Sequence, residues 1–171
     1  MKTDDEFITR KQIRLENYDY SSNGAYFVTV CTKDRQRILS DITVGAIHES
    51  PAVKLTKYGE ITIGALAKTE NRFDNATITD YVIMPDHIHI VLVLLDKKRA
   101  IRESPLQKRS ELSKIIGFFK TSVSKEIHKM NPDLDVWQRG YFEHIIRNEN
   151  DLYEIRKYIE NNPKKWVLED K

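Results

Sequence analysis

The chain of 171 residues has a single cysteine, no long hydrophobic run and almost no net charge. Cys31 has no second cysteine to pair with, which excludes an intrachain disulfide and favours a reducing, cytoplasmic compartment. The longest apolar run, residues 90–95, is far too short to span a bilayer, and residues 1–10 lack the apolar segment of a signal peptide. We therefore expect no membrane partner. The net charge of +2 does not by itself indicate a nucleic-acid binder.

The length indicates one domain, residues 1–171, that is large enough to bury a core. Residues 1–22 are expected to form a polar lead-in, and residues 97–109 a mobile basic connector that contains a proline. Residues 38–55 are predicted to form a short hairpin or arm.

Hydrophobic periodicity predicts the order strand, helix, strand, strand, helix, strand, helix. The strands are predicted at residues 25–32, 77–84, 87–95 and 136–147, and the helices at residues 57–72, 110–130 and from 149 to a stop at Pro163. This order is typical of an α+β, ferredoxin-like (RRM-like) antiparallel sheet with helices on one face, plus one extra C-terminal helix.

A pair of histidines follows the turn of the central predicted hairpin. Pro85-Asp86 has the chemistry of a tight turn, so His87 and His89 open the second strand of the hairpin. Because side chains alternate along a strand, both histidines lie on one face, about 7 Å apart at Cα. Such a pair is suited to bind one divalent ion. The alternative is a structural pair that faces solvent or hydrogen-bonds a carbonyl.

The last predicted helix carries two further candidates. Asn148 is predicted to cap its start with Asp151 at the third helical position. Tyr158 and Asn162, four residues apart, lie on or beside the stripe that faces the protein. Two imidazoles and an amide oxygen leave open positions on a divalent cation, and a tyrosine beside them is a nucleophile that would form a covalent phosphotyrosine. If the helix is considered apart from the histidines, the alternative interpretation is that Asn162 is a helix C-cap and that Tyr158 is an amphipathic residue at the edge of the core.

Three sequence blocks resemble the single-tyrosine HUH transposases, and most of all the REP-associated tyrosine transposases. The blocks are Met-Pro-Asp-His-Ile-His at residues 84–89, Trp-Gln-Arg-Gly-Tyr-Phe-Glu-His-Ile-Ile-Arg-Asn at 137–148, and Tyr-Ile-Glu-Asn-Asn-Pro at 158–163. The resemblance extends over about residues 14–166. It implies a metal-dependent endonuclease and strand transferase of DNA transposition, acting on single-stranded, hairpin-forming DNA as a monomer or homodimer.

The resemblance also implies roles for residues at the matching positions. Tyr158 is the implied nucleophile, and the implied ligands of Mg²⁺ or Mn²⁺ are His87, His89 and Asn162. The tyrosine can serve the histidines of its own subunit or those of a partner. Residues of the second block are candidates for contacts to phosphate or to the metal ligands, beside a purely structural role: Glu143, His144 and Arg147.

Basic residues cluster between positions 97 and 130. The predicted DNA-binding residues in this region are Arg99, Arg102, Lys114, Lys120 and Lys125. The three lysines are predicted to project from the solvent face of the second helix, where Gly117 would let a DNA backbone approach closely. The alternative is an ordinary solvated helix face.

The alternative to an enzyme is a non-catalytic module that binds single-stranded RNA or DNA. Ferredoxin-like sheets bind RNA by stacking bases on exposed aromatic residues, and Tyr26, Phe27 and Tyr81 lie on predicted strands. Only the enzyme would form a covalent adduct with DNA.

Overall fold

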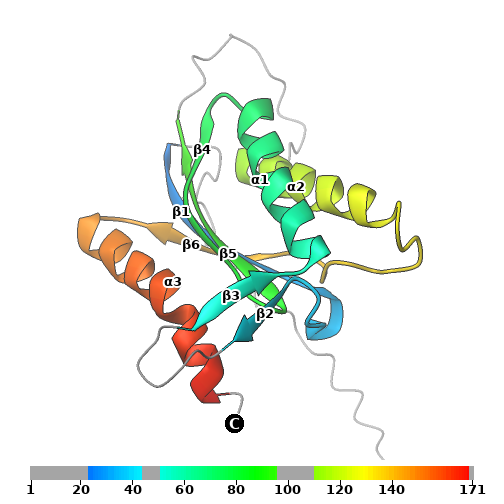
Figure 1. The fold of residues 1–171 in the computed structure, drawn as a ribbon. Helices are drawn as coiled ribbons and strands as arrows, with labels where there is room; N and C mark the ends of the chain where they lie inside the picture. Colours follow the sequence, from blue (N-terminus) through cyan, green and yellow to red (C-terminus); the bar gives the residue numbers. More distant parts are fainter. Residues whose placement is uncertain (1–22, 44–50, 96–109, 170–171) are drawn as a thin grey trace, which may run out of the picture.

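The structure is a computed structural model that describes residues 23–43, 51–95 and 110–169 (Figure 1). The predicted lead-in at residues 1–22 and the predicted connector at residues 97–109, with Arg99 and Arg102, lie outside the described residues.

The core of the fold is a four-stranded antiparallel sheet. Its strands are β1 (Gly24–Cys31), β4 (Ala76–Ile83), β5 (His87–Leu94) and β6 (Phe142–Ile146). They are arranged in the order β4-β5-β1-β6, and every neighbouring pair is antiparallel. This topology confirms the predicted ferredoxin-like α+β fold.

A short excursion separates β1 from the first helix. The three-residue turn η1 (Lys33–Arg35) leads into a hairpin of β2 (Ser40–Thr43) and β3 (Ala52–Leu55). The predicted hairpin within residues 38–55 is therefore confirmed.

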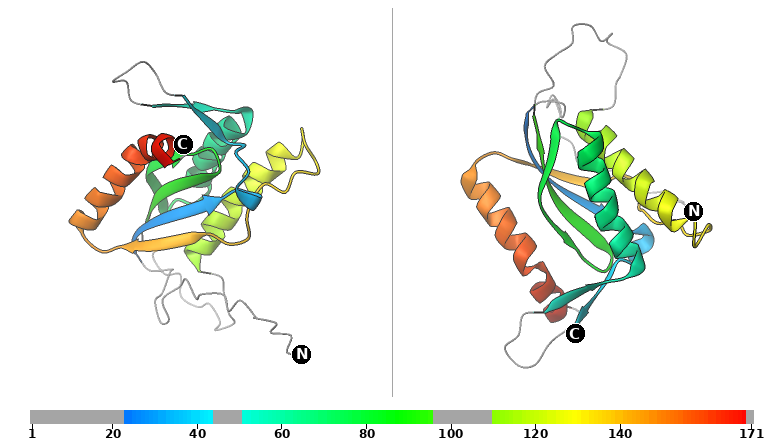
Figure 2. Two further views of the ribbon diagram at one scale, coloured as in Figure 1. Left: turned by 90° about the horizontal axis from the view of Figure 1, so that it is seen from below. Right: turned by 45° about the horizontal axis from the view of Figure 1, so that its top comes forward.

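Helices α1 (Lys57–Arg72) and α2 (Glu111–Ile127) cover one face of the sheet (Figures 1 and 2). Thr56 caps α1 by accepting a hydrogen bond from the backbone N–H of Gly59, and Ser110 caps α2 in the same way. The buried core on this face joins alternate residues of β1 and β5 to one stripe of α2. It includes Tyr26, Val28, Val30, Ile88, Ile90, Leu92, Leu112, Ile116, Phe119 and Val123.

Helix α3 (Glu149–Glu169) lies on the opposite face of the sheet (Figure 2). Ile155 and Ile159 of α3 pack against Val91 of β5, with Phe27 and Ile146 at the border of this second cluster. Because residues alternate along β5, His87 and His89 share the face that α3 covers. The backbone N–H of Asp151 donates to Oδ1 of Asn148 at 2.9 Å, which confirms the predicted cap.

The prediction that Pro163 ends the last helix is wrong, because α3 continues through Pro163 to Glu169. A proline inside a helix removes one backbone hydrogen bond and costs about 3 kcal/mol. The segment beyond it makes contacts that offset part of this cost. The ring of Trp166 lies 6.1 Å from that of His87, and the guanidinium carbon of Arg37 lies 5.1 Å from the Trp166 ring centroid. Asn162 is therefore inside the helix and is not a C-cap.

The predicted fourth strand at residues 136–147 is too long, since β6 covers only Phe142–Ile146. Gly140 has a φ of 80°, which does not fit a strand. Lys120 Nζ donates to the carbonyl oxygens of Gln138 at 2.7 Å and Gly140 at 2.8 Å, which takes both carbonyls out of the ladder. Phe142, the first residue of β6, is 46% exposed. None of the described helices is long and apolar enough to cross a membrane.

Candidate active site

The turn between β4 and β5 sets the position of the two histidines. The backbone N–H of Met84 donates to the carbonyl of His87 at 2.9 Å, which closes the turn. Thr32, just after β1, donates to the Asp86 carbonyl from both its N–H and its hydroxyl, each at 2.9 Å. The turn is thereby fixed to the adjacent strand. His87 and His89 are both buried, and their Nε2 atoms lie 3.0 Å apart.

Each imidazole is held through its other nitrogen. Nδ1 of His87 hydrogen-bonds the carboxylate of Asp86 at 2.5 Å, and Nδ1 of His89 lies 2.8 Å from Oγ1 of Thr29. Burial raises the pKa of Asp86, but the hydrogen bond and charge of His87, together with Arg35, outweigh burial and lower this pKa overall. The ionised carboxylate accepts the Nδ1–H of His87, so the Nε2 of His87 presents a lone pair.

The protonation state of His89 suits a ligand. Burial is the main cause that lowers its pKa to about 3, and the nearby His87 and Arg35 lower it further. His89 is therefore neutral near pH 7. Two metal–nitrogen bonds of about 2.1 Å at a right angle would place the nitrogens about 3 Å apart, so the observed spacing fits a shared cation.

A third ligand for a metal ion at the histidines would have to be a side chain other than His, Cys, Asp or Glu. In residues 23–43, 51–95 and 110–169, no group of three His, Cys, Asp or Glu side chains could hold a metal ion. Asn162 is only 6% exposed, and its side chain makes no hydrogen bond within the part of the chain that the structure describes. Neither atom of this amide is among the fully buried, unpartnered side-chain atoms of the described residues, so the amide is open to a ligand. A cation at the histidines would give its oxygen a role.

Tyr158 lies beside the histidines of its own chain. Its ring contacts the His89 ring edge-on with centroids 5.3 Å apart, and Phe27 stacks on His89 at 5.0 Å. The Tyr158 side chain is 41% exposed, so a substrate can reach it. The Nζ atom of Lys165 lies 5.7 Å from the Tyr158 ring centroid. By contrast, the hydroxyl of Tyr141 lies 3.0 Å from that of Ser113 on α2, on the other face of the sheet.

The residues of the second sequence block do not join this cluster. His144 Nε2 lies 3.0 Å from Oδ2 of Asp151, which also accepts the backbone N–H of Arg147 at 3.1 Å. These two bonds lower the pKa of Asp151 and fix the start of α3. Glu143 pairs with Val28, whose side chain is buried on the α1–α2 face, so Glu143 lies on the face opposite the histidines.

The predicted lysine face is only partly free. Lys114 pairs with Glu111 at 3.1 Å, and Lys125 is exposed. The sequence did not predict the contacts of Lys120, whose ammonium group is bound to two backbone carbonyls. Burial lowers the pKa of Lys120. A phosphate path along α2 would lie on the sheet face opposite the histidines.

The aromatic residues of the alternative binding module do not share one exposed face. Tyr26 is fully buried beneath α1 and α2, and Phe27 lies against His89 and Tyr158 on the other side. Tyr81 is exposed, but it pairs with Ile90, whose side chain lies in the α1–α2 core. In the described sheet, these three aromatic residues therefore do not form one exposed surface for stacking bases.

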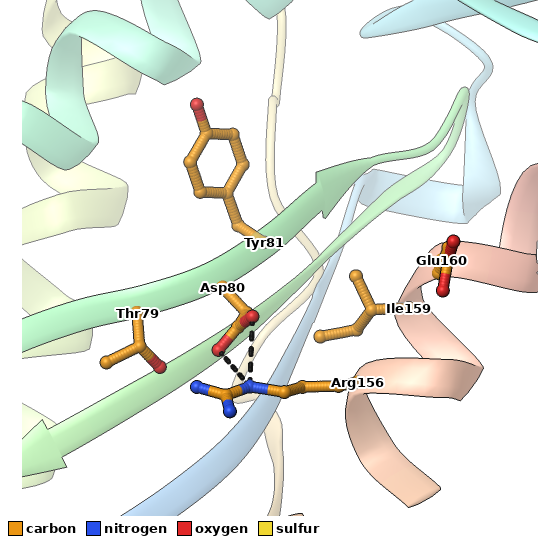
Figure 3. Close-up of a pocket in the computed structure, with 6 residues that line it drawn as sticks. All are labelled: Thr79, Asp80, Tyr81, Arg156, Ile159 and Glu160. Carbon is orange, nitrogen blue, oxygen red and sulfur yellow. Dashed lines mark hydrogen bonds and ion pairs between the residues drawn. The ribbon is translucent and has the colours of Figure 1, made fainter. Parts of the chain in front are cut away.

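A pocket lies on the flank of α3 that faces β4 (Figure 3). Arg156 Nε donates to both carboxylate oxygens of Asp80, at 3.0 and 3.2 Å, and so ties α3 to the edge strand. The ring of Tyr81 points away from this ion pair (Figure 3). The contact fixes the position of the helix that carries Tyr158.

Sequence reasoning missed the residues that support the histidines. Asp86 directly precedes His87 in the turn, so its hydrogen bond to His87 could have been predicted from the sequence. Thr29, Phe27 and Trp166 join the site only through strand pairing or through the continuation of α3 past Pro163. Their positions depend on tertiary contacts that no local pattern encodes.

Known proteins resemble this chain over most of its length. The family model described as "Transposase IS200 like" matches residues 20–162. An uncharacterized protein of Haemophilus influenzae (strain ATCC 51907 / DSM 11121 / KW20 / Rd) is 31% identical over 92% of this chain and 89% of its own length. A second protein of the same strain, named "Putative REP-associated tyrosine transposase", is 28% identical over 88% of this chain and 77% of its own length.

A solved structure shares the fold. It is that of a REP-associated tyrosine transposase bound to a REP hairpin, with a TM-score of 0.61 and 21% identity over 89% of this chain and 73% of that chain. The family match covers most of the sequence and includes His87, His89, Tyr158 and Asn162. The chain therefore belongs to the IS200-like transposase family, and its class of activity is DNA transposition.

Proposed function

We propose that this transposase cuts and rejoins single-stranded DNA through Tyr158, with Mg²⁺ or Mn²⁺ held by His87, His89 and Asn162. The observation that carries the proposal is the contact between the rings of Tyr158 and His89 within one chain, at 5.3 Å between centroids. It brings an accessible phenol next to two imidazole nitrogens that are 3.0 Å apart. Each chain would accordingly use its own tyrosine.

The proposed cleavage is a transfer of a phosphodiester to the tyrosine. The Tyr158 oxygen forms a bond to phosphorus, the bond to one strand oxygen breaks, and the phenol proton ends on the released oxygen. The phosphotyrosine keeps the energy of the broken bond for rejoining to another strand end. The ammonium group of Lys165 lies 5.7 Å from the centroid of the Tyr158 ring, where its positive charge would attract the phosphodiester.

The residues around the histidines would preorganise the site. When bound, a divalent cation polarises the phosphodiester as a Lewis acid. Asp86 fixes the ring of His87 and increases its basicity, while Thr29 fixes the ring of His89. Asn162 would add an amide oxygen, which suits a hard divalent cation.

We propose hairpin-forming DNA as the substrate class. The support comes from the similar solved protein, which is bound to a REP hairpin, and from the relative with a REP-associated name. In a hairpin, the paired stem would present a single-stranded flank to the open side of the Tyr158 ring.

Labelled hairpin DNA with single-stranded flanks tests the proposal. Incubation with Mg²⁺ or Mn²⁺ should produce a covalent protein–DNA adduct that survives denaturing electrophoresis, and a chelator should prevent its formation. Palindromes that flank the gene of this protein are the first substrates to test. Non-covalent binding to these palindromes, without an adduct under any metal condition, would contradict the enzymatic proposal.

A further inference from the structure

Phe142 is an exposed aromatic residue in register with the candidate active site. It begins β6 and lies directly opposite Thr29 of β1, and Thr29 lies directly opposite His89 of β5. Directly paired residues of an antiparallel sheet point to the same face. The hydrogen bond between Thr29 and His89 confirms this for one pair. Phe142, Thr29 and His89 therefore form one row across three strands.

Helix α3 leaves this corner of the sheet uncovered. The helix packs on Ile146, at the far end of β6, and on Phe27, Val91 and Val82. Phe142, at the near end of β6, is 46% exposed, and Tyr158 is 41% exposed. Phe142 and Tyr158 are thus both accessible to solvent on this side of the sheet. With strands about 4.8 Å apart, Phe142 lies about 10 Å from His89 at Cα.

The backbone before Phe142 is held in place from the opposite side. Lys120 binds the carbonyl oxygens of Gln138 and Gly140, and the hydroxyl of Tyr141 is hydrogen-bonded to Ser113 of α2. Because Tyr141 is fixed toward α2, the next residue has to face the histidines. Arg139, in the same loop, is exposed and adds positive charge near this corner.

We infer that Phe142 stacks a base of the single-stranded DNA within a few nucleotides of the phosphodiester at Tyr158. The identity of the ligand rests on the proposed function. Stacking on an aromatic ring is tolerant of base identity, and its loss weakens binding by about 5- to 150-fold. A lone exposed aromatic is common on protein surfaces. Phe142 differs because it continues the row that contains Thr29 and His89.

The test uses a hairpin oligonucleotide with oligothymidylate tails that carry 2-aminopurine at one tail position at a time. Fluorescence and affinity are measured on the full chain in the presence of a chelator, so that no cleavage occurs. We expect quenching at one position for the wild type and for Phe142→Tyr. Phe142→Leu keeps an apolar side chain but removes the ring, so it should lose the quenching and bind about 5- to 150-fold more weakly.

Tyr81→Ala is the matched control. Tyr81 is 45% exposed on the other edge strand and lies on the opposite sheet face, so its removal should leave both readouts unchanged. Unchanged quenching and affinity in Phe142→Leu would overturn the inference, and so would an equal loss in Tyr81→Ala. Adduct formation is followed separately with metal. An adduct without stacking overturns this inference alone, whereas stacking without an adduct supports it and counts against the proposed chemistry.

Discussion

The rings of Tyr158 and His89 meet edge to face, although one residue lies on the C-terminal helix and the other on a central strand. Two features produce this contact. Strand alternation puts His89 on the face that α3 covers, and the packing of Ile155 and Ile159 on Val91 fixes the helix above it. The site therefore depends on how α3 is attached as well as on the residues that react.

Asp86→Asn should weaken metal binding while the fold remains intact. Asparagine can still accept the hydrogen bond from His87 Nδ1, but it lacks the charge that increases the basicity of the imidazole. We expect the affinity for Mn²⁺ to fall about 10- to 100-fold, measured by electron paramagnetic resonance titration. Asp133→Asn removes an exposed carboxylate after α2, away from the site, and should leave the affinity unchanged. Equal affinities in Asp86→Asn and wild type would reject the role of Asp86.

Lys120→Gln should destabilise the protein. The ammonium group of Lys120 donates two charge-assisted hydrogen bonds that hold the loop before β6, and glutamine is too short to replace both. We expect a loss of about 1–2 kcal/mol in the free energy of unfolding, measured by urea denaturation. Lys125→Gln, on the same helix but exposed, should change it by less than about 0.5 kcal/mol. Equal stability of the two variants would show that the loop does not depend on Lys120.

Local patterns predicted most of the fold and the centre of the site. Alternation along β5 was sufficient to place His87 and His89 on one face, and helical spacing was sufficient to turn Asn162 inward. The error at Pro163 and the contacts of Lys120 that the sequence did not predict have one cause. In each case a tertiary contact overrides a local rule: Trp166 packs beyond the proline, and two distant carbonyls bind the lysine. Cross-strand partners such as Thr29 required the sheet register, which the sequence alone does not specify.

The start of α3 should weaken at acidic pH. Hydrogen bonds from His144 and from the Arg147 backbone lower the folded-state pKa of Asp151 below its ordinary value of 3.8. The stabilisation is therefore fully present above about pH 4 and is lost as the pH falls through the lowered pKa. Asp151→Asn should be less stable than wild type near pH 7, and urea denaturation should show this difference shrinking below pH 4. Asp133→Asn, an exposed carboxyl after α2, is the control. A difference that stays constant between pH 7 and pH 3 would contradict this role.

Gly117→Ala and Gly64→Ala should each stabilise the protein. Both glycines lie inside helices, and apart from the local helix backbone no atom lies within 4 Å of an added Cβ at either position. Alanine should therefore gain about 0.5–1 kcal/mol of unfolding free energy, measured by thermal denaturation. Since α1 and α2 both lie on the face opposite the histidines, neither change should weaken binding of hairpin DNA. A loss of binding in Gly117→Ala alone would place the DNA along α2.

The central claim is that Tyr158 is the nucleophile, and the most direct measurement is adduct formation by Tyr158→Phe on labelled hairpin DNA with Mn²⁺. Only the phenol oxygen is removed, so the adduct should disappear while DNA affinity stays within a few-fold of wild type. Tyr153→Phe changes a more exposed tyrosine on the same helix and should form the adduct normally. Loss of the adduct in Tyr158→Phe alone is the predicted result. An adduct that persists in Tyr158→Phe and disappears in Tyr153→Phe would contradict the account.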